Sequence, residues 1–405
     1  MFEGRNMSKK DLTVSVVGCA LVDCVYAGVD FNSEAFRKYS SVEKGDGGLV
    51  PGQLVFMESL EKFTAVPARQ MMSELTGNAP VSAENVGGPA IVAAINAAQL
   101  CSYLPVKVNF YGACGNDAEG DFIKQLVSKT PVDMSNYHTE ENISTPSTQV
   151  LSDPAYHNGK GERTFINVVG SAGNYDSRML GDKFFDADIL LFSATALVPQ
   201  IHDGLTALLK RGKAAGKINM VSTVFDFRNE MRDPNNRWPL GESDESYQYI
   251  DLLAVDWEEA RRMSGEEELE KIVEFFTSRG VSSICITHGA KNFYIYSDGR
   301  LFREMPLRAM PVNELVNEDL AKYPQRRGDT TGCGDNFAGG LLASLIMQLA
   351  EGRNPGELDM RTAAAWADAS GGFACFCLGG TYLEKQPGEK YAQVKRYCDY
   401  YLANQ

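Results

Sequence analysis

The sequence predicts an α/β protein in which a largely parallel sheet is covered by helices on both faces. Short, apolar, β-rich runs alternate with amphipathic stretches of helix length, a pattern typical of buried parallel strands. The predicted strands are residues 14–18, 108–112, 189–193, 218–224, 252–255 and 283–287. The predicted helices are residues 89–101, 119–129, 201–215 and 267–279.

Two segments interrupt this alternation, and we expect them to form a small accessory β-layer. Residues 25–80 are long, turn-rich and mixed in pattern, and residues 147–170 contain two β-rich runs around a polar turn. Residues 292–302 contain a further pair of β-rich runs around an Asp-Gly turn, which predicts a hairpin. The length suits one large domain, and we expect a single domain over residues 1–405.

The composition argues against several classes of partner. The chain has 39 basic and 53 acidic residues and a net charge of −14, which repels nucleic-acid backbones and anionic membranes. No run reaches the roughly 18 apolar residues that a membrane span needs, and no apolar signal core is present. The 9 cysteines lie in apolar segments without zinc-site spacing, as in reduced cytosolic proteins. We expect a cytoplasmic protein that binds neither nucleic acid nor a membrane.

A glycine-rich run at residues 326–352 is the strongest functional signal. It has the letters RRGDTTGCGDNFAGG, followed directly by the apolar pattern LLASLIMQLAEG. It is no P-loop, because no Gly-Lys pair is followed by Ser or Thr, and no dinucleotide loop, because no apolar strand precedes it. We predict a helix that begins between residues 331 and 335, is capped by Thr330 or Thr331, and ends at Gly352.

The first turn of this helix has the chemistry of an anion site. The first N–H groups of a helix lack partners within it and carry a positive partial charge. Gly332 and Gly334 have no Cβ, so an anionic group can approach the neighbouring amides closely. The alternative on these residues alone is a glycine-rich turn that only lets the helix pack closely.

The same run closely resembles the DTTGAGDxFxGG signature of the ribokinase-like (PfkB) carbohydrate kinases, with Cys333 in place of the usual alanine. Other stretches are similar to motifs of that family and occur in the same order. They are VVGCALVD at 16–23, NVGGPAIVAAINAAQL at 85–100, YGACGNDAEG at 111–120, GERTFI at 161–166, DFR at 226–228 and ITHGAKN at 286–292.

This resemblance implies a Rossmann-like three-layer αβα sandwich with a small β-sheet lid. We expect the lid to combine parts of residues 25–60 and 147–170. The resemblance also implies an ATP-dependent kinase that phosphorylates a hydroxyl group of a small sugar or sugar-like substrate.

The resemblance assigns the chemistry to the glycine-rich run. Asp335 is expected to take the proton of the attacking hydroxyl, while the amides of Gly332, Cys333, Gly334 and Asp335 hold the transferred phosphoryl group. We expect the helix dipole to keep the Asp335 carboxylate ionised, which makes it a weak base. The alternative for Asp335 is a carboxylate that only stabilises its own helix.

Further residues are implied to bind the two substrates. The implied substrate-binding residues are Asp23, Gly87 and Gly88. The implied nucleotide-binding residues are Thr287, Gly289, Gly332 and Gly334. Two positions depart from the family pattern: Val92 replaces a substrate-contacting asparagine, and Asn292 replaces the second glycine of the nucleotide-side turn.

Three carboxylates are implied to bind cations. Asp256 and Glu259 match the N-x-x-E motif that organises Mg²⁺ through water, with Asp256 in place of the asparagine. A spacing of three puts both on one helix face. Asp329 is implied to help bind a monovalent cation such as K⁺. The alternatives are a solvated acidic helix start and a local turn contact.

Two other functions stay open. Residues 36–63 loosely resemble the extended amino-terminal region of adenosine-kinase-like members, which favours a nucleoside kinase. The departures at Val92, Asp256 and Asn292 would suit a non-catalytic sugar-binding regulator. The identity of the substrate and the role of residues 303–328 are not determined by the sequence. An exposed lid edge would permit a homodimer.

Overall fold

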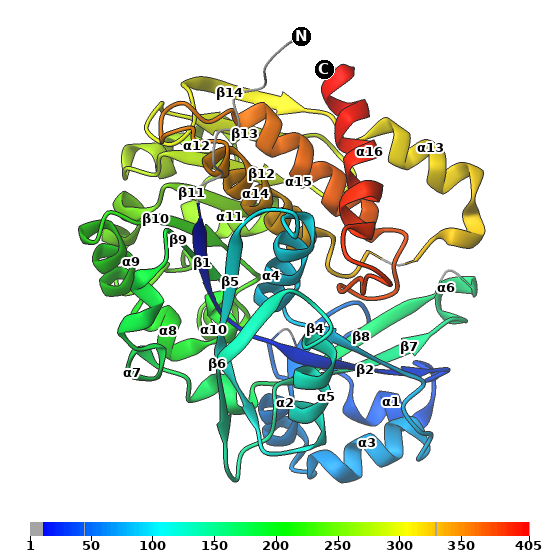
Figure 1. The fold of residues 1–405 in the computed structure, drawn as a ribbon. Helices are drawn as coiled ribbons and strands as arrows, with labels where there is room; N and C mark the ends of the chain where they lie inside the picture. The colour runs from blue at the N-terminus through cyan, green and yellow to red at the C-terminus, as the bar shows by residue number, and fades with distance from the viewer. Residues whose placement is uncertain (1–10, 44, 160, 329, 405) are drawn as a thin grey trace.

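Two sheets of different size make up the fold (Figure 1). The computed structural model describes residues 11–43, 45–159, 161–328 and 330–404. Within these residues one sheet has nine strands and the other has five. The predicted α/β architecture with a second, smaller sheet is therefore confirmed.

The larger sheet is parallel except at one edge. Its strands in spatial order are β14 (Met305–Met310), β13 (Phe293–Ser297), β12 (Ser283–Thr287), β11 (Leu252–Asp256), β10 (Ile218–Ser222), β9 (Ile189–Ser193), β1 (Leu12–Val17), β5 (Val106–Gly115) and β6 (Val132–Glu140). Among its described strands only two neighbouring pairs, β12–β13 and β13–β14, are antiparallel. All six strands predicted from apolar runs are present in this sheet.

Helices pack on both faces of the larger sheet (Figure 1). The helices of the described residues are α1 (Glu34–Tyr39), α2 (Met57–Thr64), α3 (Ala68–Thr76), α4 (Pro89–Leu100), α5 (Ala118–Val127), α6 (Tyr156–Gly159), α7 (Ser177–Leu180), α8 (Pro199–Asp203), α9 (Leu205–Ala214), α10 (Phe227–Arg232), α11 (Trp257–Ser264), α12 (Leu269–Ser278), α13 (Glu314–Lys322), α14 (Cys333–Ala350), α15 (Met360–Ala374) and α16 (Glu389–Ala403). None of them is long and apolar enough to cross a membrane.

Alternate residues of β9 show the two cores that these helices form. Ile189 and Leu191 belong to the core that includes α4, α14, α15 and α16. Leu190 and Phe192 belong to the core that includes α9 and α12. Because successive side chains of a strand point to opposite faces, an apolar run such as β9 requires cover on both sides.

The smaller sheet, which we call the lid sheet, has the strand order β3 (Leu54–Phe56), β8 (Glu162–Val168), β7 (Ser147–Asp153), β2 (Leu21–Ala27) and β4 (Ala83–Gly87). It takes strands from both expected segments, and it also takes β2 and β4, which the sequence did not assign to it. One of its faces is covered by α1, α2 and α3, whose side chains form a separate core with Leu151 and Ile166.

Three expected elements differ in detail. The predicted hairpin has its second strand at β14, beyond residues 292–302, because residues 298–304 form the connection. The predicted helix at residues 201–215 is divided into α8 and α9 at Gly204. Residues 303–328 contain β14 and α13, so this segment is structured.

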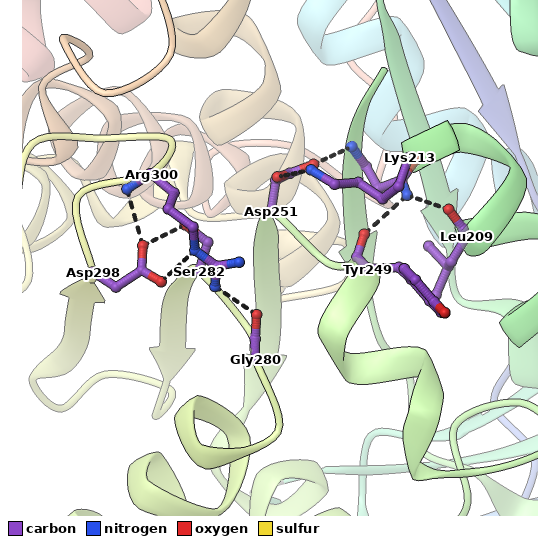
Figure 2. Close-up of polar contacts among 9 residues, drawn as sticks. Leu209, Lys213, Tyr249, Asp251, Gly280, Ser282, Asp298 and Arg300 are labelled. Carbon is purple, nitrogen blue, oxygen red and sulfur yellow. Dashed lines mark hydrogen bonds and ion pairs between the residues drawn. The ribbon is translucent and has the colours of Figure 1, made fainter. Parts of the chain in front are cut away.

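Polar contacts fix the edge of the larger sheet at which β10, β11 and β12 begin (Figure 2). Asp251 accepts hydrogen bonds from Lys213 Nζ at 2.6 Å and from the backbone N–H of Asn219 at 2.8 Å. Nearby, Asp298 accepts from Arg300 Nε at 2.6 Å and from Ser282 Oγ at 2.8 Å. These contacts fix the loops at this edge of the sheet relative to one another.

The opposite edge, where the same strands end, carries the candidate site. Thr223 follows β10, Asp256 ends β11, and Thr287 ends β12 directly beside Asp256 in the strand register. Ligands of open parallel sheets bind at the carboxyl ends of the strands. Structural contacts therefore lie at one edge of the larger sheet, and the candidate site lies at the other.

We predict that Asp251→Ala destabilises the fold without impairing the site. Asp251 is 9% exposed, and its removal leaves the buried N–H of Asn219 without its acceptor. The expected loss is about 1–3 kcal/mol in the free energy of unfolding, measured by urea denaturation. Lys210→Ala is the control, because the Lys210 side chain is 61% exposed and its ion pair is expected to contribute less than about 1 kcal/mol. Equal losses in the two variants would contradict the prediction.

Candidate active site

The amino-terminal end of α14 is formed mainly by backbone groups. Its N-cap is Gly332, with a left-handed φ of 75°, rather than Thr330 or Thr331 as expected. A glycine is favoured at this φ, and it offers no side chain to the first N–H groups of the helix. The N–H of Cys333 donates to the Thr330 carbonyl at 3.3 Å, so this amide has a partner within its own loop.

Two glycines of this turn face different surroundings. A Cβ on Gly332 would lie 2.4 Å from the Cα of Gly380, so the two backbones are in direct contact. A Cβ on Gly334 would meet no atom within 4 Å, and Gly334 is exposed. The Gly332 side of the turn is therefore closed by protein, and the Gly334 side is open to a ligand.

Asn336 fastens this turn to the segment at residues 378–380. Its Nδ2 donates to the Gly332 carbonyl at 2.9 Å and to the Gly380 carbonyl at 2.8 Å. Its Oδ1 accepts from Lys390 Nζ at 3.1 Å. The sequence analysis missed both Asn336 and Lys390. The position of Asn336 inside the signature was the one available signal, and nothing local marks Lys390 on its polar helix.

Asp335 stands in the first turn of α14, next to the open face of Gly334. It is half-buried, and burial raises the pKa of its carboxyl group to about 6. This direction is opposite to the expected effect of the helix dipole, and its cause is the loss of solvation around the carboxyl group. The carboxylate is still largely ionised at neutral pH, and it is a stronger base than an ordinary aspartate.

Asp256 and Glu259 form a capping box at the start of α11. Asp256 is the N-cap, its Oδ1 accepts from the Glu258 N–H at 2.9 Å, and Glu259 Oε2 accepts from the Asp256 N–H at 3.3 Å. Thr223 Oγ1 also donates to Glu259 Oε2, at 2.6 Å. Burial, with smaller contributions from the negative charges of Asp256 and Asp335, raises the pKa of Glu259 to about 7. The three carboxylates are thus close enough to interact electrostatically.

This donor set fits a hydrated Mg²⁺ ion. Mg²⁺ is usually bound by one or two carboxylates together with waters and substrate phosphates. Asp256 and Glu259 supply such a pair, and no cluster of three or more His, Cys, Asp or Glu side chains able to hold a metal occurs among the described residues. The capping contacts also stabilise α11, so the structural and the metal-binding interpretations are compatible. Asp329, the expected contact of a monovalent cation, lies outside the described residues.

Asp23 lies on β2 of the lid sheet, not at the end of the first strand of the larger sheet. It faces Asn85 across the antiparallel pair of β2 and β4. A Cβ on Gly87 would lie 2.2 Å from Asp23 Oδ2, so only glycine lets this carboxylate lie against the β4 backbone. Gly88 follows, with φ of 98°, and turns the chain into α4. These three predicted substrate residues are therefore brought together.

The segment at residues 378–380 connects the lid sheet with α14. Asn85 Nδ2 donates to the Leu378 carbonyl at 2.9 Å, and Gly380 contacts Gly332. Val92 on α4 packs beside Gly380, since a Cβ there would lie 3.1 Å from Val92 Cγ2. The position at which the family has a polar asparagine thus forms an apolar wall beside the closed side of the turn.

Thr287 and Gly289 are placed together at the end of β12. Gly289 has a left-handed φ of 57°, whereas Asn292 is not among the described residues with positive φ. The departure at Asn292 therefore needs no special backbone conformation. His288 stacks on Trp257, with ring centroids 5.0 Å apart, and so joins this turn to the start of α11.

A cleft of about 770 Å³ runs between the lid sheet and the signature loop. Arg163 and Phe165 of β8 line one side, and Thr330 and Thr331 line the other. On the closed side of the turn, Cys333 Sγ lies 3.5 Å from Cys375 Sγ. The cleft gives a small molecule access to the space between the two sheets.

The comparisons with known proteins agree with this arrangement. The sequence matches the pfkB family of carbohydrate kinases over residues 75–386. A fructokinase from Vibrio alginolyticus is 25% identical over 289 residues, which cover 69% of this chain and 83% of the relative. The chain therefore belongs to the PfkB family of carbohydrate kinases, and it is an ATP-binding phosphotransferase with an alcohol group as acceptor.

Solved structures show the same fold. An adenosine kinase from Schistosoma mansoni in complex with 2-fluoroadenosine has a TM-score of 0.65 at 16% identity, with coverage of 93% of this chain and 98% of that one. A putative ribokinase II from E. coli in complex with ATP and Mg²⁺ has a TM-score of 0.62 at 16% identity, with coverage of 96% and 100%. The fold is thus the ribokinase-like α/β fold with a small lid sheet.

We predict opposite effects for two glycine substitutions in this turn. Gly332→Ala places a Cβ against Gly380 at a left-handed φ, so we expect a loss of about 1–3 kcal/mol in the free energy of unfolding. Gly334→Ala is expected to leave stability unchanged or to raise it by up to about 1 kcal/mol, because alanine is the better helix former. Its methyl group stands on the open face, so turnover should fall while urea denaturation is normal. Normal turnover in Gly334→Ala would show that no substrate approaches this face.

Proposed function

We propose that the chain transfers the γ-phosphoryl group of ATP to a hydroxyl group of a small sugar or sugar-like substrate at the start of α14. One observation carries this proposal: the open amide face at Gly334 and the carboxylate of Asp335 share one helical turn. Phosphoryl transfer needs groups that stabilise the negative charge of the migrating phosphoryl group and a base that takes the proton of the attacking hydroxyl, and little other covalent chemistry.

In this proposal the backbone of the turn binds the migrating group. The amides of Gly332, Gly334 and Asp335 stabilise the charge that develops on its oxygens, together with the amide of Cys333 once its long bond to Thr330 opens. Asp335 accepts the proton of the attacking hydroxyl. Its raised pKa suits this task, since a base works best when its pKa is near the working pH.

The carboxylate pair on α11 is proposed to hold Mg²⁺ through water. When bound with the nucleotide, Mg²⁺ supplies positive charge to the phosphate oxygens. Thr223 orients Glu259, and Asp256 fixes the start of the helix that carries it. Thr287 and Gly289 are proposed to line the nucleotide side. A K⁺ site at Asp329 stays a prediction.

Asp23, Gly87 and Gly88 are proposed to bind the acceptor. A carboxylate accepts hydrogen bonds from vicinal hydroxyl groups, and the two glycines let the acceptor approach the backbone. Val92 is buried beside Gly380 and offers no hydrogen bond to an acceptor. A nucleoside stays the second candidate because residues 36–63 loosely resemble the amino-terminal region of adenosine-kinase-like members. A homodimer formed through the lid would use β3 or β4, the edges of the lid sheet, or the lid face that α1–α3 do not cover.

The acceptor class can be tested by thermal shift and by ADP release. We expect ribose, fructose, 2-keto-3-deoxygluconate or inositol to raise the melting temperature and to stimulate ADP release from Mg-ATP. Stabilisation by adenosine or guanosine alone would identify a nucleoside kinase. Binding of a sugar with no ADP release would identify a non-catalytic regulator.

We predict that Asp335→Asn lowers kcat by at least roughly 100-fold, the usual scale for a positioned base. The amide is close in size to the carboxylate, so the affinity for Mg-ATP, measured by calorimetry, should change little. Glu258→Gln is the control, because Glu258 stands on α11 but forms an ion pair with Arg261 instead of the Thr223 contact. A variant Asp335→Asn with near-normal kcat would remove Asp335 from its role as base.

The pH dependence follows from the two raised pKa values. Asp335 works as a carboxylate, so kcat/KM should fall as the pH drops through about 6, and protonation of Glu259 near pH 7 should steepen the fall. Glu259→Gln should leave a single protonation step near pH 6 and raise the Mg²⁺ concentration needed for half-maximal rate. A rate that stays constant down to pH 5 would contradict both assignments.

A further inference from the structure

Lys390 is a buried lysine whose position no part of the proposed mechanism explains. It is 1% exposed and lies in the first turn of α16. Lysine is rarely buried unless its ammonium is paired. Among the described residues no carboxylate lies within ion-pair distance of Nζ, and the recorded hydrogen bond of Nζ goes to Asn336 Oδ1 at 3.1 Å.

Asn336 connects Lys390 with the first turn of α14, which is the proposed phosphoryl-binding turn. Both hydrogen atoms of its Nδ2 are directed at carbonyl oxygens, those of Gly332 and Gly380. This fixes the amide orientation, because Oδ1 must then point at a donor, and Lys390 supplies it. The backbone N–H of Asn336 also donates to the Gly332 carbonyl, at 2.8 Å. One side chain therefore holds the N-cap residue that sets the direction of the first amides of α14.

We infer that Lys390 is a positioning residue of the transfer reaction: through Asn336 its ammonium fixes Gly332 and Gly380, and it places a buried positive charge behind the phosphoryl-binding turn. The inference rests on the proposed function and deepens it. Lys390 itself touches no reacting atom. Its contribution is to keep the turn in one conformation while negative charge moves across it.

The electrostatic surroundings show that burial of the protonated Lys390 side chain is unfavourable for folding. Burial lowers the pKa of Lys390 to about 8, while electrostatic interaction with Cys377 and Glu384 acts in the opposite direction and favours the protonated form. The acidic residues on the other helices packed against α16 are Asp368 of α15 and Glu314, Glu318 and Asp319 of α13, and none of them contributes to the pKa shift of Lys390. The sequence of α4 contains no charged residue. The unfolded chain holds this proton up to a pH of about 10, so the fold gains stability between pH 8 and 10 as the buried lysine becomes neutral.

Because burial of this charge is unfavourable for folding, a role of Lys390 in the reaction can be distinguished from a purely structural role. If Lys390 served only to fill space, a neutral side chain of similar length would leave the reaction unchanged. If it positions Asn336, the same substitution keeps or raises the stability of the fold and still slows the reaction. Activity and stability thus change in opposite directions only under the positioning role.

The test uses Lys390→Met with Lys395→Met as the matched control. Lys395 is on the same helix, its side chain is 42% exposed, and it pairs with Asp399. For Lys390→Met we expect kcat to fall about 10- to 100-fold with KM for the acceptor nearly unchanged, and the melting temperature to stay equal or rise. The wild-type protein and Lys395→Met should lose kcat as the pH rises through about 8, whereas Lys390→Met should lack this step. Normal kcat in Lys390→Met, or an unchanged step near pH 8, would overturn the inference.

A double-mutant cycle checks the route through Asn336. The loss of kcat in Asn336→Ala combined with Lys390→Met should be close to the larger single loss, because both changes break one chain of contacts. Additive losses would show that Lys390 does not act through Asn336. If Asn336→Ala fails to fold, the pH profile of Lys390→Met still decides the question.

The failure of the proposed function would give a different result. If the wild-type chain phosphorylates no sugar or nucleoside, that function is wrong. The positioning role can then be tested with ADP, Mg²⁺ and aluminium fluoride, a mimic of the migrating phosphoryl group. Weaker binding of this mixture by Lys390→Met, at unchanged affinity for ADP, supports the inference. Equal binding by both proteins, or none by either, overturns it.

Discussion

The site depends on one backbone contact, that between Gly332 and Gly380. A single Cβ on Gly332 would come within 2.4 Å of the Gly380 Cα, so the start of α14 and the segment after α15 pack without any side chain between them. The left-handed φ of Gly332 then determines which way the following amides point. Val92 completes the contact from α4. Two helices, α14 and α4, and the loop after α15 thus meet at a point where only glycine fits, although they are far apart in the sequence, and the direction of the amides of the turn is a consequence of that packing.

The carboxylates at the two edges of the larger sheet differ in how far the protein compensates their negative charge. Asp251 and Asp298 lie at the edge where the parallel strands begin, and each accepts hydrogen bonds from a basic side chain and from a neighbouring polar group. Asp335 and Glu259 lie where strands end, and burial raises the pKa of both. The first arrangement satisfies its carboxylates within the chain and therefore stabilises the fold. The second leaves negative charge incompletely compensated, which is unfavourable until a cation and a substrate supply the missing partners.

The sequence predicted the larger sheet well because its strands are apolar on both faces, and such runs are visible without tertiary information. It predicted the signature turn because the glycines and Asp335 are adjacent in the chain. The lid sheet was less predictable, since β4 has three of its five residues at least partly exposed and pairs with β2 across about 60 residues. Asn336 and Lys390 were not predicted for the same reason. Their roles come from contacts between α14 and α16, and the neighbouring sequence of a lysine on a polar helix does not indicate that it is buried. The N-cap was mistaken because side-chain capping was assumed where close packing selected a glycine.

The lid sheet and the first turn of α14 are mechanically connected, so the proposed acceptor residues and the proposed transfer residues are held in one arrangement. β4 carries Asn85, which bonds the Leu378 carbonyl, and two residues later Gly380 touches Gly332. β4 also continues through Gly87 and Gly88 directly into α4, which brings Val92 to the same place. The lid therefore reaches the turn by two short paths, one through a hydrogen bond and one through the covalent chain. Because a displacement of β4 must be absorbed along both paths, the geometry seen by an acceptor beside Asp23 and the geometry of the α14 amides are parts of a single constraint.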